Sequence, residues 1–327
     1  MRIAVLGAGA WGTALALTFS GRHAVSLWEW DAVQARALRS ARENRRYLPG
    51  YPFPNNLTVD DDVAAAVRGV ELVIVATPVA GLRPALRLLA QSRVSAPIVW
   101  ACKGLESASG RLPHEVVGEE LGAAHLCAAL SGPSFAAEVA KAMPTAVTLA
   151  SADLDFARRT VAALNTPRLR LYANDDVVGV EIGGAVKNVL AIAAGISDGM
   201  GFGLNARAAL ITRGLAEIAR LGLALGGKQH TFMGLAGMGD LILTCTGDLS
   251  RNRRVGLALA AGNSLDSILV ELGHIAEGVH TAREVARMAA DLGIEMPITQ
   301  AVKGILFDAV PAKQAVEQLL ARDPKVE

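Results

Sequence analysis

The first half of the chain alternates short apolar runs with segments of helical periodicity. Each run is about five residues long, which is typical of a strand buried on both faces of a parallel sheet. The helical segments between them, the first at about Ala10–Ser20, predict parallel βαβ units with right-handed crossovers. The expected strands are Arg2–Leu6, Ala24–Trp28, Glu71–Ala76, Pro97–Ala101, Leu126–Leu130, Thr145–Leu149 and Arg168–Tyr172.

One segment interrupts this alternation. Arg45–Leu57 contains three prolines, one glycine and two asparagines. Such a composition cannot continue the helix that precedes it. We expect a loop between two units here.

From about Gly179 the strand-like runs disappear, and long segments rich in alanine and leucine show helical periodicity. Arg213 and Glu217 lie one turn apart and are expected to pair on an exposed helix face. Further helices are expected at Val255–Ala261, Ser264–Leu272, Ala282–Leu292 and Ala312–Leu320. The pattern predicts an α/β fold, with a Rossmann-type doubly wound sheet domain over residues 1–185 and an all-helical domain over residues 186–327.

Composition and charge narrow the function. The chain has 327 residues, of which 52% are hydrophobic, and its 32 basic and 31 acidic residues leave a net charge of +1. This balance predicts no general attraction to nucleic acid or anionic lipid, so any phosphate site must be local. Cys102, Cys127 and Cys245 lack metal-ligand spacing, and we expect neither a metal nor a disulfide framework.

The sequence predicts a cytoplasmic protein. The N-terminus enters a strand pattern at once and lacks the features of a signal peptide. The most apolar stretches, such as Val189–Ile196, are shorter than the roughly 20 residues that cross a bilayer. We therefore expect no membrane span.

A glycine-rich motif directly follows the first expected strand. Gly7-Ala8-Gly9-Ala10-Trp11-Gly12 matches G-x-G-x-x-G and opens a helix. In this context the first glycine permits a tight turn, the second allows the pyrophosphate of a dinucleotide to approach, and the third lets helix and strand pack closely. The helix N-terminus supplies N–H groups for the phosphates. The motif predicts binding of NAD or NADP, and the alternative is a purely structural turn.

The end of the second strand bears on the choice between NAD and NADP. It reads Glu29-Trp30-Asp31, and either acid is suited to accept a hydrogen bond from a ribose 2′-hydroxyl but not to hold a 2′-phosphate. This favours NAD. The alternative is that Asp31 only caps the next helix, and that Arg36 or Arg39 reaches back to a phosphate.

Two segments follow strands at their carboxyl ends, where open α/β sheets bind ligands. The first contains Lys103 and the second, Ser131–Phe135, contains Gly132 and Ser134. Backbone N–H groups and Ser134 are suited to hold an anionic oxygen. Ordinary strand-to-helix turns with a solvated lysine are the competing interpretation.

Lys187 lies in an otherwise apolar helical stretch, next to Asn188. Burying an ammonium among glycine, alanine and valine is costly unless a partner compensates. A partly desolvated lysine has a pKa closer to the range useful for proton transfer, which makes Lys187 a candidate acid and base. The alternative is a lysine that extends to solvent.

Two further segments look chemical. Gly234–Leu241 is rich in glycine and carries one carboxylate, Asp240, which is suited to orient a lysine or bind a hydroxyl. Ser250–Arg254 opens a helix with Ser250 as the expected N-cap, and the helix dipole with a guanidinium makes a phosphate cradle. A plain loop acid and a basic surface turn are the respective alternatives.

Together these segments resemble the bacterial NAD(P)-dependent glycerol-3-phosphate dehydrogenase family, in the family's order and over essentially the whole chain. The motifs that carry the resemblance are GAGAWGTALA, CKG, LSGPSFAAEV, GGAVKNVLAIAAGISDGMGFG, GLAGMGDLILTCTG, SRNRRVG and AEGVHTA. The resemblance implies hydride transfer between NAD(P)H and dihydroxyacetone phosphate, giving sn-glycerol 3-phosphate for glycerophospholipid synthesis, with a homodimer possible.

The resemblance also implies site residues. Lys187 is the proton-transfer lysine, with Lys103 and Asp240 beside the reaction. The implied substrate-binding residues are Lys103, Gly132, Ser134, Lys187, Asp240, Ser250, Arg251 and Asn252, and the cofactor-binding residues, taken with the glycine motif and the end of the second strand, are Gly7, Gly9, Ala10, Trp11, Gly12, Trp30, Asp31, Lys103, Ala136, Arg251 and Glu277.

The chain departs from the family's pattern at Trp30, where bacterial members commonly carry an Arg or His that helps to hold the NADP phosphate. The CKG motif is a milder change, at Cys102. Two rival functions remain: a β-hydroxyacid or 6-phosphogluconate-type dehydrogenase, and a nicotinamide-sensing regulator without turnover.

Overall fold

The computed structural model describes residues 1–107, 109–272 and 276–321. Contacts divide the chain into two compact units. The first comprises Met1–Lys103 with Arg111–Val180, and the second comprises Gly104–Gly110 with Glu181–Glu327. The division falls within the long helix α8 (Val177–Gly199), as does the predicted domain boundary, which stays a prediction.

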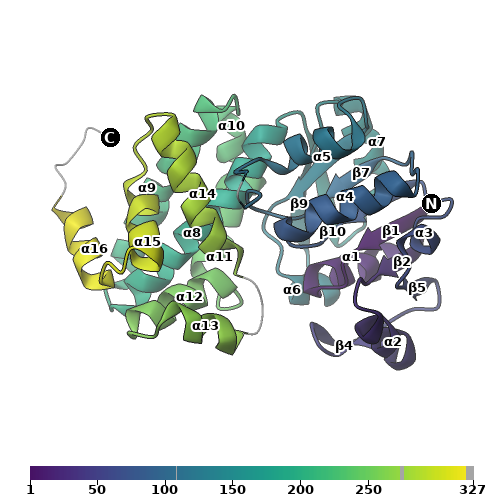
Figure 1. Cartoon of the computed structure of the whole chain (residues 1–327), viewed down its shortest axis with the longest axis horizontal. Helices are drawn as coiled ribbons and strands as arrows, with labels where there is room; N and C mark the ends of the chain where they lie inside the picture. Colours follow the sequence, from purple (N-terminus) through teal and green to yellow (C-terminus); the bar gives the residue numbers. More distant parts are fainter. Residues whose placement is uncertain (108, 273–275, 322–327) are drawn as a thin grey trace. The chain divides into compact units, whose positions relative to one another are not determined.

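The first unit is built on an eight-stranded sheet in the order β10-β9-β8-β7-β6-β1-β2-β5 (Figure 1). The order reverses between β6, β1 and β2, as in a doubly wound fold. The strands are β1 (Arg2–Leu6), β2 (Ala24–Trp28), β5 (Leu57–Asp60), β6 (Leu72–Val75), β7 (Ile98–Trp100), β8 (Cys127–Ser131), β9 (Thr145–Ala150) and β10 (Leu169–Asn174).

Apolar side chains alternate between the two faces of this sheet, and each face is covered by helices. Ile3 and Val5 belong to a buried cluster with residues of α1, α2 and α7. On the opposite face α4 and α5 pack against each other. The helices are α1 (Ala10–Ser20), α2 (Ala32–Ala41), α3 (Val63–Ala66), η1 (Val79–Gly81), α4 (Leu82–Gln91), α5 (Pro113–Leu121), α6 (Ala136–Ala140) and α7 (Leu154–Leu164).

The fold class is confirmed, but the expectation of a parallel βαβ unit between Leu126–Leu130 and Thr145–Leu149 is wrong. β9 pairs antiparallel with β8, although β10 runs parallel to β9. The reason lies in the connection. α6 has five residues and spans only ~7.5 Å, whereas five residues of strand span roughly 16 Å. The chain does not return along the sheet and therefore enters β9 from the edge at which it left β8.

The segment expected to be a loop, 45–57, is also more ordered than predicted. β3 (Glu43–Asn44) pairs antiparallel with β4 (Leu48–Pro52), and Leu57 begins β5, which adds to the main sheet beside β2. Proline is tolerated in such a two-stranded ribbon because its missing N–H costs no ladder bond on an open edge.

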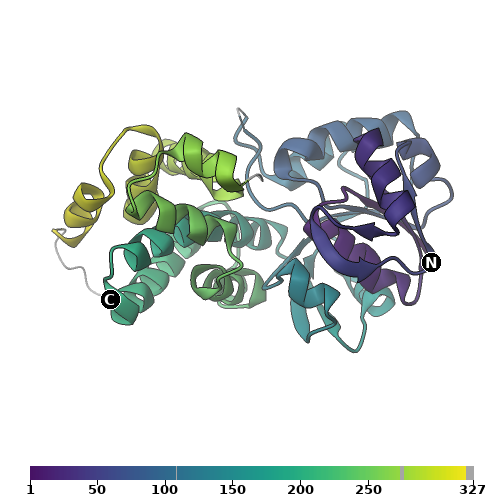
Figure 2. The same cartoon turned by 90° about the horizontal axis from the view of Figure 1, so that it is seen from below.

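The second unit is helical in the residues that the structure describes (Figure 2). It contains most of α8, then α9 (Gly203–Ala224), α10 (Gln229–Phe232), the π-helical turn η2 (Leu235–Gly239), α11 (Asp240–Thr246), α12 (Arg251–Ala260), α13 (Leu265–Leu272), α14 (Glu277–Asp291), α15 (Pro297–Phe307) and α16 (Ala312–Leu320). The prediction that this part of the chain is helical is confirmed.

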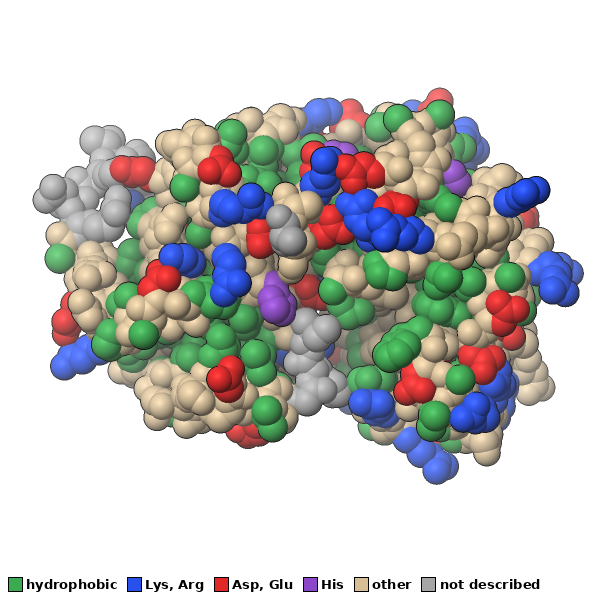
Figure 3. All heavy atoms as spheres, viewed as in Figure 1, with side chains coloured by type: hydrophobic (Ala, Val, Ile, Leu, Met, Phe, Trp, Pro, Cys, Tyr) green, Lys and Arg blue, Asp and Glu red, His purple; other side chains and the backbone are tan. Residues whose placement is uncertain are grey.

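Helix α8 is the central element of this unit. Its 23 residues are long and apolar enough to cross a membrane by length and composition, yet 89% of its most apolar window is buried inside the protein. This burial is what the core helix of a globular unit shows. Acidic and basic side chains are interspersed over the face drawn in Figure 3, in keeping with the small net charge.

One prediction for this unit is wrong. Glu217 was expected on the exposed side of a helix, but it is 2% exposed. Its carboxylate accepts hydrogen bonds from the backbone N–H groups of Ile298 and Thr299, at the start of α15. The carboxylate satisfies N–H groups that a helix start leaves without partners inside the helix, and burial follows from that role.

Candidate active site

The candidate residues of the first unit lie at one edge of its sheet. β1, β2, β6, β7 and β8 are parallel to one another, so their carboxyl ends share an edge. Gly7 follows β1, Glu29 follows β2, and Gly132 follows β8. Open α/β sheets bind ligands at this edge, next to the point where strand order reverses.

The glycine turn has the geometry that a dinucleotide requires. Gly7 has a φ of +106°, and a Cβ at Gly12 would lie 1.9 Å from the carbonyl oxygen of Gly7, so neither position accepts a side chain. A Cβ at Gly9 would meet no atom within 4 Å. That open space faces the N-terminus of α1, where N–H groups and the helix dipole favour a phosphate. The residues present therefore fit a bound dinucleotide.

Trp11 and Ala136 are brought together beside this turn. Both pack against a small buried cluster formed by Ala14, Leu48 and Val139. The first turn of α1, the start of α6 and the β4 strand thus share one apolar contact region. The structure places these two cofactor-side candidates as neighbours, although they are far apart in sequence.

At the end of β2 the three candidate side chains differ. Trp30 is 76% exposed, and Asp31 caps α2 by accepting from the N–H of Val33, so the capping role proposed as the alternative is present. Glu29 is buried. Burial raises the pKa of the Glu29 carboxyl, while hydrogen bonds from the backbone of Asp31 and Ala8 lower it. Glu29 therefore contacts the glycine turn itself.

Of the two arginines weighed for a phosphate role, Arg39 has another partner. Its guanidinium donates to both carboxylate oxygens of Asp61 at 3.1 Å. The Asp61 side chain is held by this bidentate contact. Arg36 is exposed.

Lys103, Gly132 and Ser134 meet at one carbonyl. The Lys103 Nζ donates to the Gly132 oxygen at 3.0 Å, and the Ser134 hydroxyl donates to the same oxygen at 2.9 Å. Gly132 has a φ of +138°, which a side chain would strain. The structure thus brings together three residues expected to contact substrate.

In the second unit Lys187 is buried within α8, and the alternative of a lysine extended to solvent is wrong. The residue is 6% exposed, and Asp240 is 1% exposed. The Lys187 Nζ donates to the Asp240 Oδ1 at 2.5 Å and to the Thr244 hydroxyl at 2.9 Å. The Thr244 hydroxyl in turn donates to the Asp240 carbonyl at 2.6 Å. The costly burial of the ammonium is compensated by this ion pair.

Close packing explains why these groups meet. The glycine-dense segment is not a loop but the π-helical turn η2, which leads directly into α11 at Asp240. A Cβ at Gly183, one turn before Lys187, would lie 2.5 Å from the carbonyl oxygen of Ala236. Only glycine lets α8 approach η2 this closely, and that approach carries Asp240 to the ammonium. π-helical turns are frequent at functional sites.

The start of α12 forms the second polar cluster of this unit. Ser250 caps the helix by accepting from the N–H of Arg253, as expected. The Asn252 amide donates to the side-chain oxygen of Asn188 at 2.9 Å and accepts from the N–H of Gly278 at 3.0 Å. The Asn252 amide thus joins α12 to α8 and α14, and its partner on α8, Asn188, directly follows Lys187.

Arg251 and Glu277 are electrostatic neighbours. Part of the Arg251 side chain is exposed to solvent. Desolvation by the surrounding protein nevertheless lowers the pKa of its guanidinium, while the Glu277 carboxylate raises it. Arg253, two residues on, pairs with Asp198 at 2.7 Å and holds α12 to the end of α8. The first turn of α12 is therefore fixed relative to Lys187.

Comparison with known proteins identifies the family. Residues 2–157 match the family described as NAD-dependent glycerol-3-phosphate dehydrogenase N-terminus, and residues 176–317 match its C-terminus counterpart. A glycerol-3-phosphate dehydrogenase (NAD(P)+) of Aromatoleum aromaticum is 66% identical over the full length of both chains. The chain belongs to the NAD-dependent glycerol-3-phosphate dehydrogenase family.

Other members of the glycerol-3-phosphate dehydrogenase family agree with this assignment. The enzyme of that name from Dechloromonas aromatica is 64% identical, covering 100% of this chain and 99% of the relative. The crystal structure of glycerol-3-phosphate dehydrogenase from Coxiella burnetii is 45% identical, covers 98% of this chain and 99% of its own, and has a TM-score of 0.94. The sequence-based resemblance is confirmed.

Two residues outside the predicted set contact predicted site residues of this family member. Thr244 contacts both Lys187 and Asp240, and Asn188 holds Asn252. The signal available in sequence was their spacing: Thr244 follows Asp240 by one helical turn, and Asn188 adjoins Lys187.

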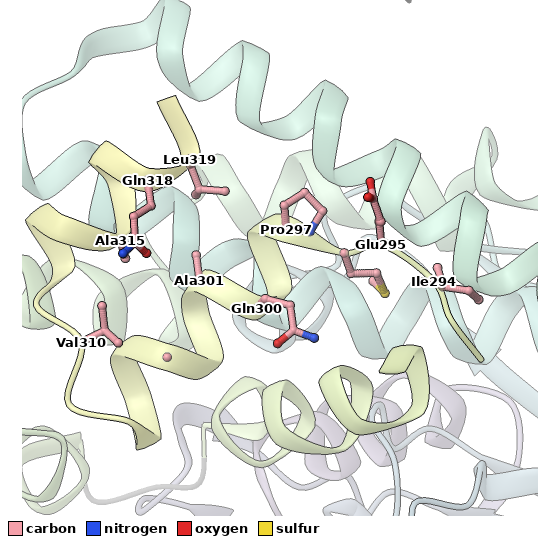
Figure 4. A pocket seen from close by; sticks show the side chains of 11 residues that line it. Ile294, Glu295, Pro297, Gln300, Ala301, Val310, Ala315, Gln318 and Leu319 are labelled. Atoms are coloured by element: carbon pink, nitrogen blue, oxygen red, sulfur yellow. The ribbon is translucent and has the colours of Figure 1, made fainter. Parts of the chain in front are cut away.

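A cavity of about 400 Å³ lies elsewhere in the second unit of this family member (Figure 4). It is lined mainly by α15 and α16, with side chains such as Gln300, Ala315 and Leu319. None of the predicted site residues lines it. The predicted site residues of this unit lie in the polar clusters and not at this cavity.

Proposed function

We propose that this chain catalyses the reversible reduction of dihydroxyacetone phosphate to sn-glycerol 3-phosphate with NADH or NADPH. The observation that carries the proposal is the buried Lys187–Asp240–Thr244 cluster in a chain of this family. A buried ammonium with a hydroxyl and a carboxylate around it is suited to exchange a proton with a substrate oxygen.

In the proposed mechanism one polar cluster binds the substrate phosphate and the other exchanges a proton with the substrate oxygen. A bound nicotinamide supplies the hydride. Arg251, at the start of α12, holds the substrate phosphate, with Ser250 and Asn252 fixing that turn. Gripping this remote group positions the ketone and lowers the entropic part of the barrier.

As negative charge develops on the ketone oxygen, the Lys187 ammonium donates a proton to it, and in the reverse direction the amine accepts one. Asp240 and Thr244 orient the Lys187 Nζ through the contacts at 2.5 and 2.9 Å. Lys103 adds positive charge, and Gly132 and Ser134 complete the substrate contacts. The remaining predicted residues, Gly7, Gly9, Ala10, Trp11, Gly12, Trp30, Asp31, Ala136 and Glu277, bind the dinucleotide.

We further propose a preference for NAD over NADP. The buried Glu29 carboxylate at the end of β2 occupies the place from which a Rossmann-type acid binds the ribose. A 2′-phosphate brought there would meet a like charge. The exposed Trp30 offers no positive charge in compensation.

The physiological setting completes the proposal. The product is the backbone of glycerophospholipids, so we place the enzyme at the start of their synthesis, in the cytoplasm. The apolar helical half is suited to support a homodimer.

The experiment that tests the function uses purified protein, dihydroxyacetone phosphate and either NADH or NADPH, with cofactor oxidation followed by absorbance. We expect rapid oxidation of NADH that depends on the phosphorylated ketone, and slower oxidation of NADPH. Oxidation with a hydroxyacid-type substrate and none with dihydroxyacetone phosphate would favour a β-hydroxyacid dehydrogenase. Binding without turnover would favour a nicotinamide sensor.

A further inference from the structure

A buried asparagine outside every predicted motif contacts the glycine turn. Asn44, in β3, is completely buried. Its Nδ2 donates to the carbonyl oxygen of Ala8 at 2.8 Å and to the Thr13 hydroxyl at 2.7 Å. Its Oδ1 accepts from the N–H of Tyr47 at 3.1 Å. Both N–H groups and the carbonyl of this amide are therefore in use.

These contacts involve the part of the turn whose backbone has the greatest conformational freedom. Ala8 lies between the first two glycines of the motif, and Thr13 directly follows the third. Glycine-flanked backbone has wide conformational freedom. Asn44 fixes the Ala8 carbonyl, and the Ala8 backbone N–H lies near enough to the buried Glu29 carboxylate to lower the pKa of that group. The peptide group that follows Ala8 is thus held by a buried side chain from another element.

The segment that carries Asn44 is itself anchored. Arg42 precedes it with a φ of +50°, and its guanidinium donates to the carbonyl oxygens of Phe53, Pro54 and Leu57. Leu48, in the paired strand β4, packs with Ala14 of α1. The paired strands β3 and β4, held by these contacts, therefore fix the position of Asn44 beside the turn.

We propose that Asn44 is a positioning residue for the dinucleotide: it keeps the Ala8 carbonyl and the first turn of α1 in the conformation that receives the pyrophosphate. The inference rests on the proposed dinucleotide binding. Preorganised sites bind more tightly because less freedom is lost on binding. The effect should fall on the affinity for NADH and NADPH alike, because both carry the pyrophosphate, and not on the affinity for the phosphorylated ketone.

The test is Asn44→Leu, which keeps the number and branching of the side-chain heavy atoms, adds no charge near the phosphates and removes all three hydrogen bonds. The dissociation constant for NADH, measured by NADH fluorescence well below the melting temperature, is expected to rise at least about 10-fold, equivalent to about 1.4 kcal/mol. The KM for dihydroxyacetone phosphate at saturating NADH should stay within about twofold.

Asn56→Leu is the matched control. The Asn56 amide donates to the carbonyl oxygens of Ser20 and His23, at the opposite end of α1 from the glycine turn. A purely structural role would make both variants less stable and leave NADH affinity unchanged in both. We expect reduced affinity only in Asn44→Leu.

Thr13→Val is the second variant, in case Asn44→Leu does not fold. It removes one of the two hydrogen bonds that the Asn44 amide donates and keeps the shape of the Thr13 side chain, so the NADH dissociation constant should rise by roughly threefold. Unchanged affinity in the folded variants would overturn the inference while leaving the proposed function standing. Failure of the unmodified protein to bind NADH would instead contradict the proposed function itself.

Discussion

Two buried carboxylates of the helical unit show that burial alone does not identify chemistry. Asp240 and Glu217 are 1% and 2% exposed. Asp240 faces the Lys187 ammonium and the Thr244 hydroxyl, both of which belong to side chains. Glu217 faces backbone N–H groups and the Thr299 hydroxyl at the start of α15. In the proposed mechanism the partner, and not the burial, separates the pair that Asp240 forms with Lys187 from the structural cap that Glu217 forms.

The energetics of the two sites differ accordingly. Burial raises the pKa of the Glu217 carboxyl, and the hydrogen bonds from Ile298 and Thr299 lower it. Those bonds are donated by backbone N–H groups that begin a helix, so they contribute to folding. The bond that Asp240 accepts is donated by the Lys187 ammonium, a group that can release a proton. The comparison predicts that changes at one site reduce turnover and changes at the other reduce stability.

The largest effect is expected from Lys187→Met, which removes the ammonium and keeps the length of the side chain. Turnover should fall by roughly 10² to 10⁴, because no other group in the cluster carries a transferable proton of the same kind. Steady-state kinetics provide the measurement. Lys303→Met, which removes an ammonium paired with Asp308 in a partly exposed contact, is the control and should leave turnover unchanged.

Asp240→Asn should reduce turnover less, by roughly 10-fold to 100-fold, because Lys187 keeps a neighbour of the same shape but loses its counter-charge. Removing that negative charge also favours the neutral amine. We therefore expect the pH profile of turnover to move to lower pH, whereas a purely structural role of Asp240 would lower stability without moving the profile.

Glu217→Gln tests the other side of the comparison. One of the donors at the start of α15 loses its acceptor, and the free energy of unfolding should fall by about 1 to 3 kcal/mol. Urea denaturation measures the loss, with the exposed Glu271→Gln as a neutral control. Turnover of the folded variant should match that of the unmodified protein. A large loss of turnover at full stability would show that the two carboxylates are not distinct in role.

The smallest effect concerns Cys245, which is buried next to Thr244. Burial raises the pKa of the Cys245 thiol to about 12. The thiolate is the reactive form, so iodoacetamide at mildly alkaline pH should leave Cys245 unmodified in the folded protein, as peptide mass spectrometry can show. Cys102 and Cys127, which are partly exposed, should react first. Early modification of Cys245 would contradict the tight packing around Lys187.

Much of the fold was predictable because its signals are local. The apolar runs gave the main strands, and the G-x-G-x-x-G turn followed from its place between β1 and α1. β5 was not predicted, because its four residues directly follow a proline-rich segment that does not show a strand pattern. The predicted direction of β9 was wrong because an apolar run carries no information on the direction of a strand. That direction depends here on the short length of α6.

The candidate site was predictable in its parts but not in its contacts. An ammonium in an apolar helix pointed to Lys187, yet its partner lies 53 positions away. Glu217 was placed on the surface because its helical spacing with Arg213 is the same whether the face is buried or exposed. Asn44 carries no sequence signal, since a single asparagine before a loop resembles any turn residue. Long-range packing decides all three.

The central claim is that the Lys187 ammonium gives its proton to the substrate oxygen. Chemical rescue tests it most directly: turnover of Lys187→Ala is measured at saturating NADH and dihydroxyacetone phosphate, with and without added small primary amines. We predict turnover reduced by about 10² to 10⁴ without amine and rising with amine concentration. Near-normal turnover of the variant without any amine would contradict the account.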